Sequence, residues 1–185
     1  MVYNRLIPYQ TARPILMACD KRGMRIASEM GGMRYSNFNV SDLWRYITSF
    51  QTVDFSLHAM DAEKIYTPNP TPEDNMFMGQ LLQDGLYYVI TADGSDGFLG
   101  QIMHKDATKG KAISALAGHW GISSSEIVAF GDDFNDIDML RECGIGIAVE
   151  NAIAEVKAVA DFVCGANDCD GIAKWLEDSI LERMM

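Results

Sequence analysis

Acidic side chains crowd together in one short stretch of the sequence, IVAFGDDFNDIDML, which runs from Ile127 to Leu140. The stretch contains Asp132, Asp133, Asn135, Asp136 and Asp138. Carboxylates this close repel one another, and a bound cation relieves that repulsion. Mg²⁺ is commonly held by one or two carboxylates, with water and substrate phosphate completing its coordination. The stretch therefore predicts a magnesium site.

Helix capping is the alternative explanation for these residues. Any of the first three could accept hydrogen bonds at the start of the next helix, where a carboxylate contributes about 0.3–1 kcal/mol. One cap needs only one such residue, whereas the stretch carries four aspartates. A calcium-binding EF-hand loop is excluded, because Phe134 and Ile137 stand where it requires a ligand and a glycine.

The residues just before the cluster indicate where it lies. Ile127–Phe130 is apolar throughout, as expected for a parallel strand buried on both faces, and Gly131 ends it. The carboxylates follow at the carboxyl end of that strand, the edge at which open α/β sheets bind ligands. The rest of this half alternates helices with strands, which indicates parallel βαβ units. We expect helices at Lys109–Trp120, Asn135–Glu142, Ala152–Ala160 and Cys169–Arg183, and further strands at Gly146–Val149 and Phe162–Val163.

The residues before about position 100 show a different pattern. Short strand-like runs mix with helical ones and indicate an α+β domain. We expect helices at Pro8–Lys21, Ser41–Phe50 and Pro72–Gln83, and strands at Val2–Leu6, Met24–Met30, Met33–Ser36, Val53–Leu57, Glu63–Thr67, Leu86–Ala92 and Gly97–Met103, the last two as a hairpin. The predicted domains are therefore residues 1–100 and 101–185.

Composition excludes several classes of partner. The formal net charge is -11, and affinity for nucleic acid depends on clustered Lys and Arg, so we expect no nucleic acid partner. No apolar run approaches the roughly 20 residues of a spanning helix, and the N-terminus lacks the order of a signal peptide. We therefore expect no membrane contact and a cytoplasmic location. The cysteines and histidines show no paired metal-ligand spacing, which disfavours zinc chemistry.

The second half of the sequence resembles the haloacid dehalogenase superfamily, specifically its Cof-type phosphatases. The resemblance is carried by GDDFNDIDML, by the preceding DATKGKAISALAGHWGISSSEIVAF and by the following RECGIGIAVENAIAEVKAVADFVCGANDCDGIAKWLED. The first hundred residues, for instance MRYSNFNVSDLW, resemble the cap domain of these enzymes more loosely. The resemblance implies an α/β fold: a partial Rossmann-like core with a parallel sheet, and an α+β cap that selects the substrate.

The resemblance also implies roles for individual residues. Lys109 stands at the position of the lysine that steadies the nucleophile and the transferred phosphoryl group. Asp132 and Asp136 stand at metal-binding positions, with Asp132 as the direct Mg²⁺ ligand and Asp136 acting through water or neighbouring groups. Asn135 matches a residue that orients phosphate, and Asp133 is interpreted as a helix cap.

The catalytic motif of the superfamily is not found. Its first strand ends in Asp-x-Asp, in which one aspartate attacks phosphorus and the other acts as general acid and base. Asp20 is followed two residues on by Arg22, and Asp93 lies in the predicted hairpin turn. Asp136 and Asp138 have the spacing but lie in a predicted helix. The resemblance therefore implies a chain that begins at the cap, lacks the attacking group and has no activity alone.

The implied function is that of a Mg²⁺-dependent hydrolase, a phosphatase of small phosphorylated metabolites such as sugar phosphates. Two alternatives stay open: a noncatalytic fragment that needs a complementing chain, and an interaction module. In the family, the strand with the nucleophile lies beside the strand that here is Ile127–Phe130. We expect this edge to be covered by a second copy in a homo-oligomer, by a complementing chain or by a rearranged segment. The sequence does not identify the phosphorylated substrate.

Overall fold

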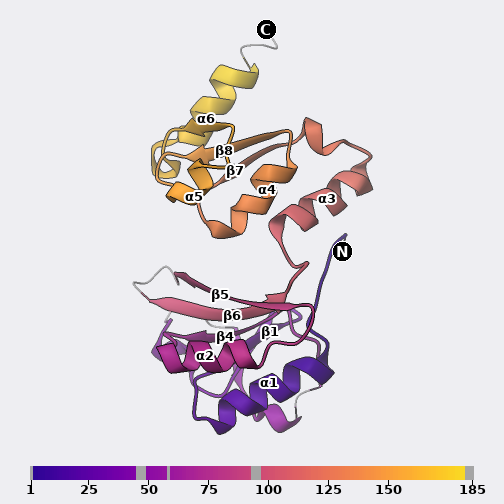
Figure 1. The fold of residues 1–185 in the computed structure, drawn as a ribbon, viewed down its shortest axis with the longest axis vertical. Coiled ribbons are helices and arrows are strands. Elements are labelled where there is room, and N and C mark those ends of the chain that lie inside the picture. Colours follow the sequence, from indigo (N-terminus) through magenta and orange to yellow (C-terminus); the bar gives the residue numbers. More distant parts are fainter. Residues whose placement is uncertain (1, 45–48, 58, 93–96, 182–185) are drawn as a thin grey trace. The chain divides into compact units, whose positions relative to one another are not determined.

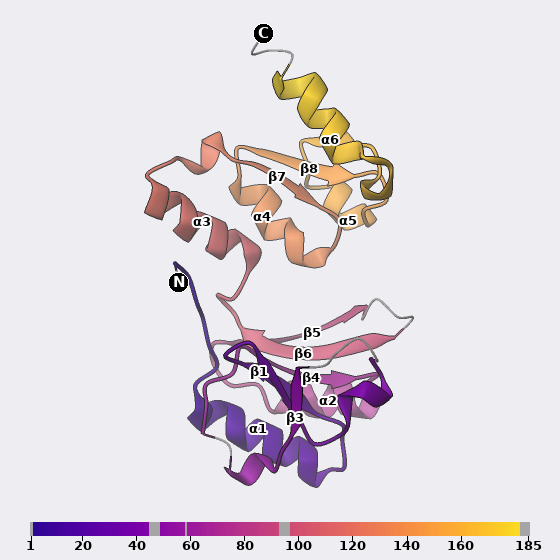
Figure 2. The same ribbon diagram turned by 180° about the vertical axis from the view of Figure 1, so that it is seen from behind.

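The computed structural model describes residues 2–44, 49–57, 59–92 and 97–181 (Figure 1, Figure 2). It consists of two compact units, Arg5–Ala107 and Met1–Asn4 together with Thr108–Met185. The predicted boundary lay between residues 100 and 101, whereas the chain passes from one unit to the other between residues 4 and 5 and between residues 107 and 108. The reason is that strand β6 (Phe98–His104) continues across the predicted boundary and pairs with β5 (Leu86–Ala92) as far as His104.

The unit Arg5–Ala107 is an α+β domain built on one mixed sheet with the strand order β3-β2-β1-β4-β6-β5. The remaining strands are β1 (Ala27–Met30), β2 (Met33–Ser36), β3 (Phe50–Thr52) and β4 (Lys64–Pro68). Neighbours are antiparallel except for β2 and β3, which are parallel. Helices α1 (Tyr9–Lys21) and α2 (Pro72–Gln80) cover the same face of this sheet (Figure 1).

The two helices are defined by their apolar spacing and their ends. The residues that α1 buries recur at the period of one helix face and are Ala12, Ile15, Leu16 and Cys19. They pack in one core with Met78 of α2 and Ile65 of β4. Helix α1 gives way to a turn at Gly23, whose φ of +77° suits glycine. A capping box between Thr71 and Asp74 begins α2.

The predicted helix Ser41–Phe50 is wrong in its described part. The Asn39 side chain accepts a hydrogen bond from the backbone N–H of Ser41 and starts only a 3-10 turn, Val40–Asp42. Val40 and Trp44 have helical spacing, but they pack on the sheet beside Tyr66. Phe50 already belongs to β3, and residues 45–48 lie outside the described part.

The two predicted strands Val53–Leu57 and Val2–Leu6 are also wrong. Phe55–Leu57 is a 3-10 turn that buries Phe55 in the same core as α1, so Phe55 serves packing rather than sheet pairing. Residues 2–6 form no strand. Sheet-like pairing there is limited to an isolated bridge, in which Ile7 and Ala62 exchange backbone hydrogen bonds of 2.8 and 2.9 Å.

The second unit has the predicted parallel βαβ organisation. Its sheet has the order β7-β8-β9, with all pairs parallel. The strands are β7 (Val128–Gly131), β8 (Ile145–Val149) and β9 (Phe162–Cys164), and the helices are α3 (Lys109–Trp120), α4 (Ile137–Glu142), α5 (Ala154–Lys157) and α6 (Gly171–Leu176). None of the helices in the described part combines the length and the apolarity needed to cross a bilayer.

Strand β7 lies at the edge of this three-stranded sheet. Within the described residues it pairs only with β8, in the register Val128 to Ile145 through Gly131 to Ala148. Its second edge therefore has no strand partner in the described part of the chain. Strand β8 is central, and its Ile147 is fully buried.

Replacement of Ile147 by alanine should destabilise the second unit, because it empties the centre of a packed core. We expect a loss of about 2–5 kcal/mol in the free energy of unfolding. Urea unfolding followed by circular dichroism measures it. Ile122→Ala is the control, since Ile122 is 40% exposed and its truncation should cost about 0.5 kcal/mol or less. Equal losses in the two variants would contradict the observed packing.

Candidate functional site

A buried carboxylate, that of Asp136, lies at the centre of the candidate site. Asp136 is only 2% exposed. One oxygen, Oδ1, accepts a hydrogen bond from the Lys109 ammonium at 2.5 Å. The other, Oδ2, accepts the backbone N–H groups of Asp132 at 3.0 Å and Asp133 at 3.3 Å. The carboxylate thus joins the start of α3 to the loop that follows β7.

The loop after β7 is shaped by its own side chains. Asp133 accepts the backbone N–H of Phe134 at 2.7 Å and forms a capping box with Asp136, which starts the 3-10 turn Phe134–Asp136. Gly131 allows this turn to fold back, because a Cβ there would lie 2.6 Å from the Cβ of Asp136. The prediction that Asp133 caps this helical segment is confirmed.

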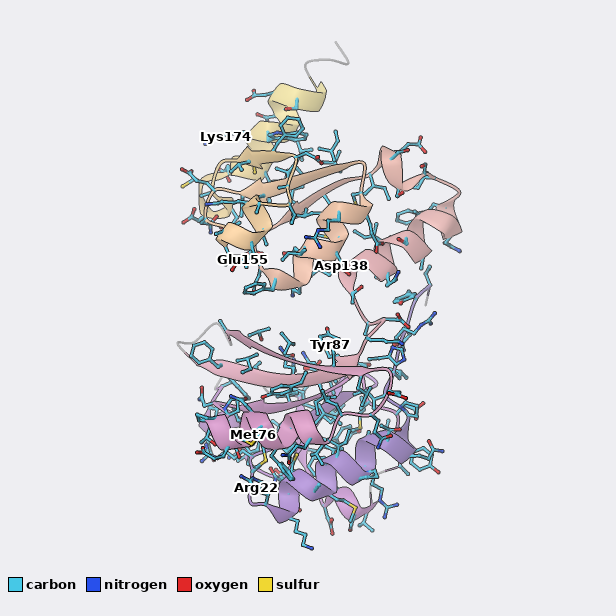
Figure 3. All side chains as sticks on the ribbon, in the orientation of Figure 1. Arg22, Met76, Tyr87, Asp138, Glu155 and Lys174 are labelled. Carbon is cyan, nitrogen blue, oxygen red and sulfur yellow. The ribbon has the colours of Figure 1, made fainter. Side chains whose placement is uncertain are left out.

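Helix α3 delivers Lys109 to this loop from 27 residues away in sequence. Thr108 caps the helix by accepting the backbone N–H of Lys111. Gly110 allows α3 to lie close against α4, because a Cβ at this position would lie 2.9 Å from Asp138 Oδ2 and 3.1 Å from the Asp138 backbone carbon. Figure 3 shows Asp138 on the part of α4 that is next to α3. This close approach places the Lys109 ammonium beside Asp136.

The two aspartates predicted to bind metal, Asp132 and Asp136, have opposite electrostatic environments. Burial opposes ionisation of Asp136, but the Lys109 ammonium and the two backbone N–H groups outweigh it and hold the pKa of Asp136 below its usual value. Desolvation raises the pKa of Asp132 above its usual value, and the nearby Asp136 and Asp133 carboxylates raise it further, against the attraction of Lys109. A cation beside Asp132 would relieve this repulsion.

The remaining predicted residues lie on the same loop. Asp132 and Asn135 are both exposed, and the Asn135 side chain has no hydrogen-bond partner among the described residues. Asp132 follows the last residue of β7 directly, so it lies at the carboxyl end of a parallel strand, as expected. The structure therefore brings Lys109, Asp132 and Asp136 together, with Asn135 on the turn beside them.

The donor set fits a hard cation with few protein ligands. In the described part of the chain, no three His, Cys, Asp or Glu side chains gather into a metal cage. Both oxygens of Asp136 already accept hydrogen bonds, whereas the exposed Asp132 carboxylate lies near two other carboxylates, those of Asp136 and Asp133. Magnesium suits such a site, because it keeps several waters and takes its other ligands from one or two carboxylates and a phosphate.

Two features of the site region were not predicted from the sequence. Gly110 was not singled out, although it adjoins Lys109, and Gly131 was predicted only to end the strand. A second Asp-x-Asp pair, Asp168 and Asp170, was also missed, although its spacing could have revealed it. This pair lies beyond β9 on a turn, with Asp170 at a φ of +57°. It does not follow directly from a strand.

The chain belongs to the haloacid dehalogenase-like hydrolases, since the model of that family matches residues 1–176. A solved structure of a sugar phosphatase of subclass IIB superposes with a TM-score of 0.78 at 26% identity, covering 96% of this chain and 68% of that one. A structure from Thermotoga maritima reaches a TM-score of 0.80 at 24% identity, covering 95% and 68%. The predicted family and α/β fold are confirmed.

Curated relatives match about half of the chain's length. A phosphoglycolate phosphatase of Archaeoglobus fulgidus is 46% identical over 81 residues, which are 44% of this chain and 36% of that protein. A 5-amino-6-(5-phospho-D-ribitylamino)uracil phosphatase of Escherichia coli is 35% identical over 101 residues, 55% and 36% of the two chains. The match thus spans little more than a third of either relative.

Replacement of Lys109 by methionine should destabilise the protein in a pH-dependent way. Since Lys109 is half exposed, we expect a loss of about 1–2 kcal/mol, between the values for surface and buried ion pairs. The stabilisation of ionised Asp136 is present above the usual aspartate pKa of 3.8 and is lost as pH falls through its lower folded pKa. The difference between variant and wild type should shrink over that interval.

Urea unfolding at a series of pH values measures this difference. Lys111→Met is the matched control, because the Lys111 side chain is 54% exposed and its ammonium lies 3.9 Å from the Glu142 carboxylate. A pH-independent loss in the Lys109 variant, or a loss no larger than in the control, would contradict the assigned pairing.

Proposed function

We propose that the chain carries the substrate-selecting cap and the metal-binding part of a Mg²⁺-dependent phosphatase that acts on small phosphorylated metabolites. The observation that carries this proposal is the Lys109–Asp136 pair held beside the exposed Asp132 at the carboxyl end of β7. An ammonium and a cation held by a carboxylate at the same strand end would both provide positive charge for a phosphoryl group.

Each side chain has a separate part in this chemistry. The Lys109 ammonium offers a point charge and donors to the phosphoryl oxygens. Asp132 would hold Mg²⁺, which when bound neutralises negative charge that develops during phosphoryl transfer. The Asn135 amide, exposed on the turn, is available to donate to a phosphate oxygen. Asp136 keeps the backbone of Asp132 and Asp133 in place through its hydrogen bonds.

The substrate class rests on chemistry that the similar proteins share. Their names specify a sugar phosphatase, a phosphoglycolate phosphatase and a phosphatase of a phosphoribityl compound. All three names denote cleavage of a phosphate ester from a small polar metabolite. We infer the same class here, with sugar phosphates as its first members to test, and assign substrate selection to the unit Arg5–Ala107.

We further propose that this chain has no turnover alone and needs a complementing strand. The sequence holds two Asp-x-Asp pairs, Asp136/Asp138 and Asp168/Asp170, and neither directly follows a strand. Without an Asp-x-Asp pair directly after a strand, neither pair offers an attacking carboxylate with an acid–base partner at a strand end. The edge of β7 that has no strand partner within the described residues can accept one from a second chain. A noncatalytic interaction module is the alternative.

Magnesium binding tests the assigned site directly. Isothermal calorimetry should detect Mg²⁺ binding to the wild-type chain, and Asp132→Asn should weaken it by at least about tenfold, because it removes the ligand charge. Glu155→Gln is the control, since Glu155 is exposed on α5 (Figure 3). Absence of magnesium uptake by the wild-type chain, or equal affinity in the Asp132 variant, would refute the site.

Hydrolysis of p-nitrophenyl phosphate with Mg²⁺ tests the activity. We expect no turnover from this chain and a signal once a chain carrying a strand that ends in Asp-x-Asp is added. Mixing should also produce a heterodimer in size-exclusion chromatography coupled to light scattering. Turnover by this chain alone that is unaffected by Asp132→Asn would show that both the site and the need for complementation are wrong.

A further inference from the structure

A reciprocal amide pair joins two loops at the carboxyl end of the parallel sheet. Asn151, on the loop after β8, donates from Nδ2 to Asn167 Oδ1 at 2.9 Å. In return, the backbone N–H of Asn167, on the loop after β9, donates to Asn151 Oδ1 at 3.2 Å. Both residues are exposed and have no part in the site described above. The pair ties the β8 loop to the β9 loop.

The β8 loop continues this connection to the metal site. Ala152 is buried and its backbone N–H donates to Val149 O at 2.9 Å, so the turn after β8 is closed. The next residue, Ile153, donates its backbone N–H to the carbonyl oxygen of Asp132 at 3.1 Å. Two residues beyond Asn151, the same short turn therefore holds the backbone of the proposed magnesium ligand.

The β9 loop is itself a firm anchor. Gly171 donates its backbone N–H to Ala166 O at 3.0 Å. A Cβ at Gly171 would overlap the carbonyl oxygen of Gly165, so the two ends of the loop are in close backbone contact. Asn167 lies within this closed segment. It is therefore fixed by the backbone around it, and Asn151 is fixed by Asn167.

We infer that Asn151 and Asn167 are positioning residues for Asp132. The hydrogen bonds run from Asn167 to Asn151, along the turn to Ile153 and to the Asp132 carbonyl. Asp136 holds the N–H of Asp132 from the other side. The backbone N–H and the backbone carbonyl of Asp132 are therefore both held by hydrogen bonds. This sets the direction of the Asp132 side chain before a cation binds.

The amide type of Asn151 is specific to this arrangement. Its side chain must donate to one partner and accept from another, and only an amide side chain of this length offers both with fixed geometry. An aspartate at the same position keeps the acceptor, loses the donor and places negative charge against Asn167 Oδ1. Asn151→Asp therefore breaks one half of the pair with almost no change in volume.

The inference rests on the proposed role of Asp132 as a magnesium ligand, and two readouts separate their failures. Hydrogen exchange of the Ile153 amide, measured without metal, reports whether the turn is held. Mg²⁺ affinity measured by calorimetry reports whether the hydrogen bond from this turn to the Asp132 carbonyl affects metal binding. We expect Asn151→Ala and Asn151→Asp to speed Ile153 exchange several-fold and to weaken Mg²⁺ binding about three- to tenfold, at or below the usual range for residues that orient metal ligands.

A stability control distinguishes positioning from a general loss of folding energy. Ser123→Ala removes the cap of the turn Ser124–Glu126 in the same unit, far in sequence from the loops concerned. It should lower the melting temperature comparably while leaving Mg²⁺ affinity and Ile153 exchange unchanged. Asn151→Ala combined with Asn167→Ala should weaken Mg²⁺ binding no more than Asn151→Ala alone, because Asn151→Ala already removes both hydrogen bonds, whereas Asn167→Ala removes only the one to its side chain.

Unchanged Ile153 exchange in both Asn151 variants overturns the inference, whatever the metal does. Faster exchange with unchanged Mg²⁺ affinity also overturns it, because the pair would then serve only the fold. If the wild-type chain takes up no Mg²⁺ while Ile153 exchange responds as expected, the proposed function fails and the hold on the Asp132 backbone stands.

Discussion

The burial of the Asp136 carboxylate is the constraint on which the candidate site depends. A buried carboxylate is costly unless donors surround it, and here the donors come from three places: the Lys109 side chain and the backbone of Asp132 and Asp133. Displacement of α3 or of the loop after β7 would leave negative charge without a partner. The fold of this unit and the geometry of the site are therefore maintained by the same group.

The charges around Asp136 distinguish a carboxylate that stabilises the fold from one available to bind a ligand. Asp136 is satisfied and stays ionised, whereas Asp132 is exposed and its pKa is raised. An aspartate held where its charge is unfavourable is typical of a functional site, since a fold gains nothing from such repulsion by itself. In a chain with a net charge of -11, this local excess of negative charge at the end of β7 supports the proposed cation site.

Local signals predicted much of the fold. The helix Lys109–Trp120 was predicted with its observed bounds, because Thr108 and Gly121 mark its two ends. The segment Ser41–Phe50 failed because apolar spacing alone does not distinguish a helix from residues that pack on a sheet face. That outcome was decided by the tertiary surface formed by other strands, which no local pattern contains.

The site was predicted unevenly for the same reason. Asp132 and Asp136 lie four residues apart, so their proximity follows from the sequence itself. The place of Lys109 came only from the family resemblance, because its contact with Asp136 depends on how closely α3 approaches α4 at Gly110. The pair Asn151 and Asn167 was missed, since asparagines sixteen positions apart give no periodic signal.

The strand order β7-β8-β9 limits which loops a single side chain can connect directly. Neighbouring strands lie about 4.8 Å apart, so the first and third are separated by roughly 10 Å, which exceeds the reach of an asparagine. The hydrogen bonds described above therefore connect the β9 loop to the loop after β7 by way of the loop after β8. Insertions into the loop after β8 would break this hydrogen-bonded connection even if every chemical group were retained.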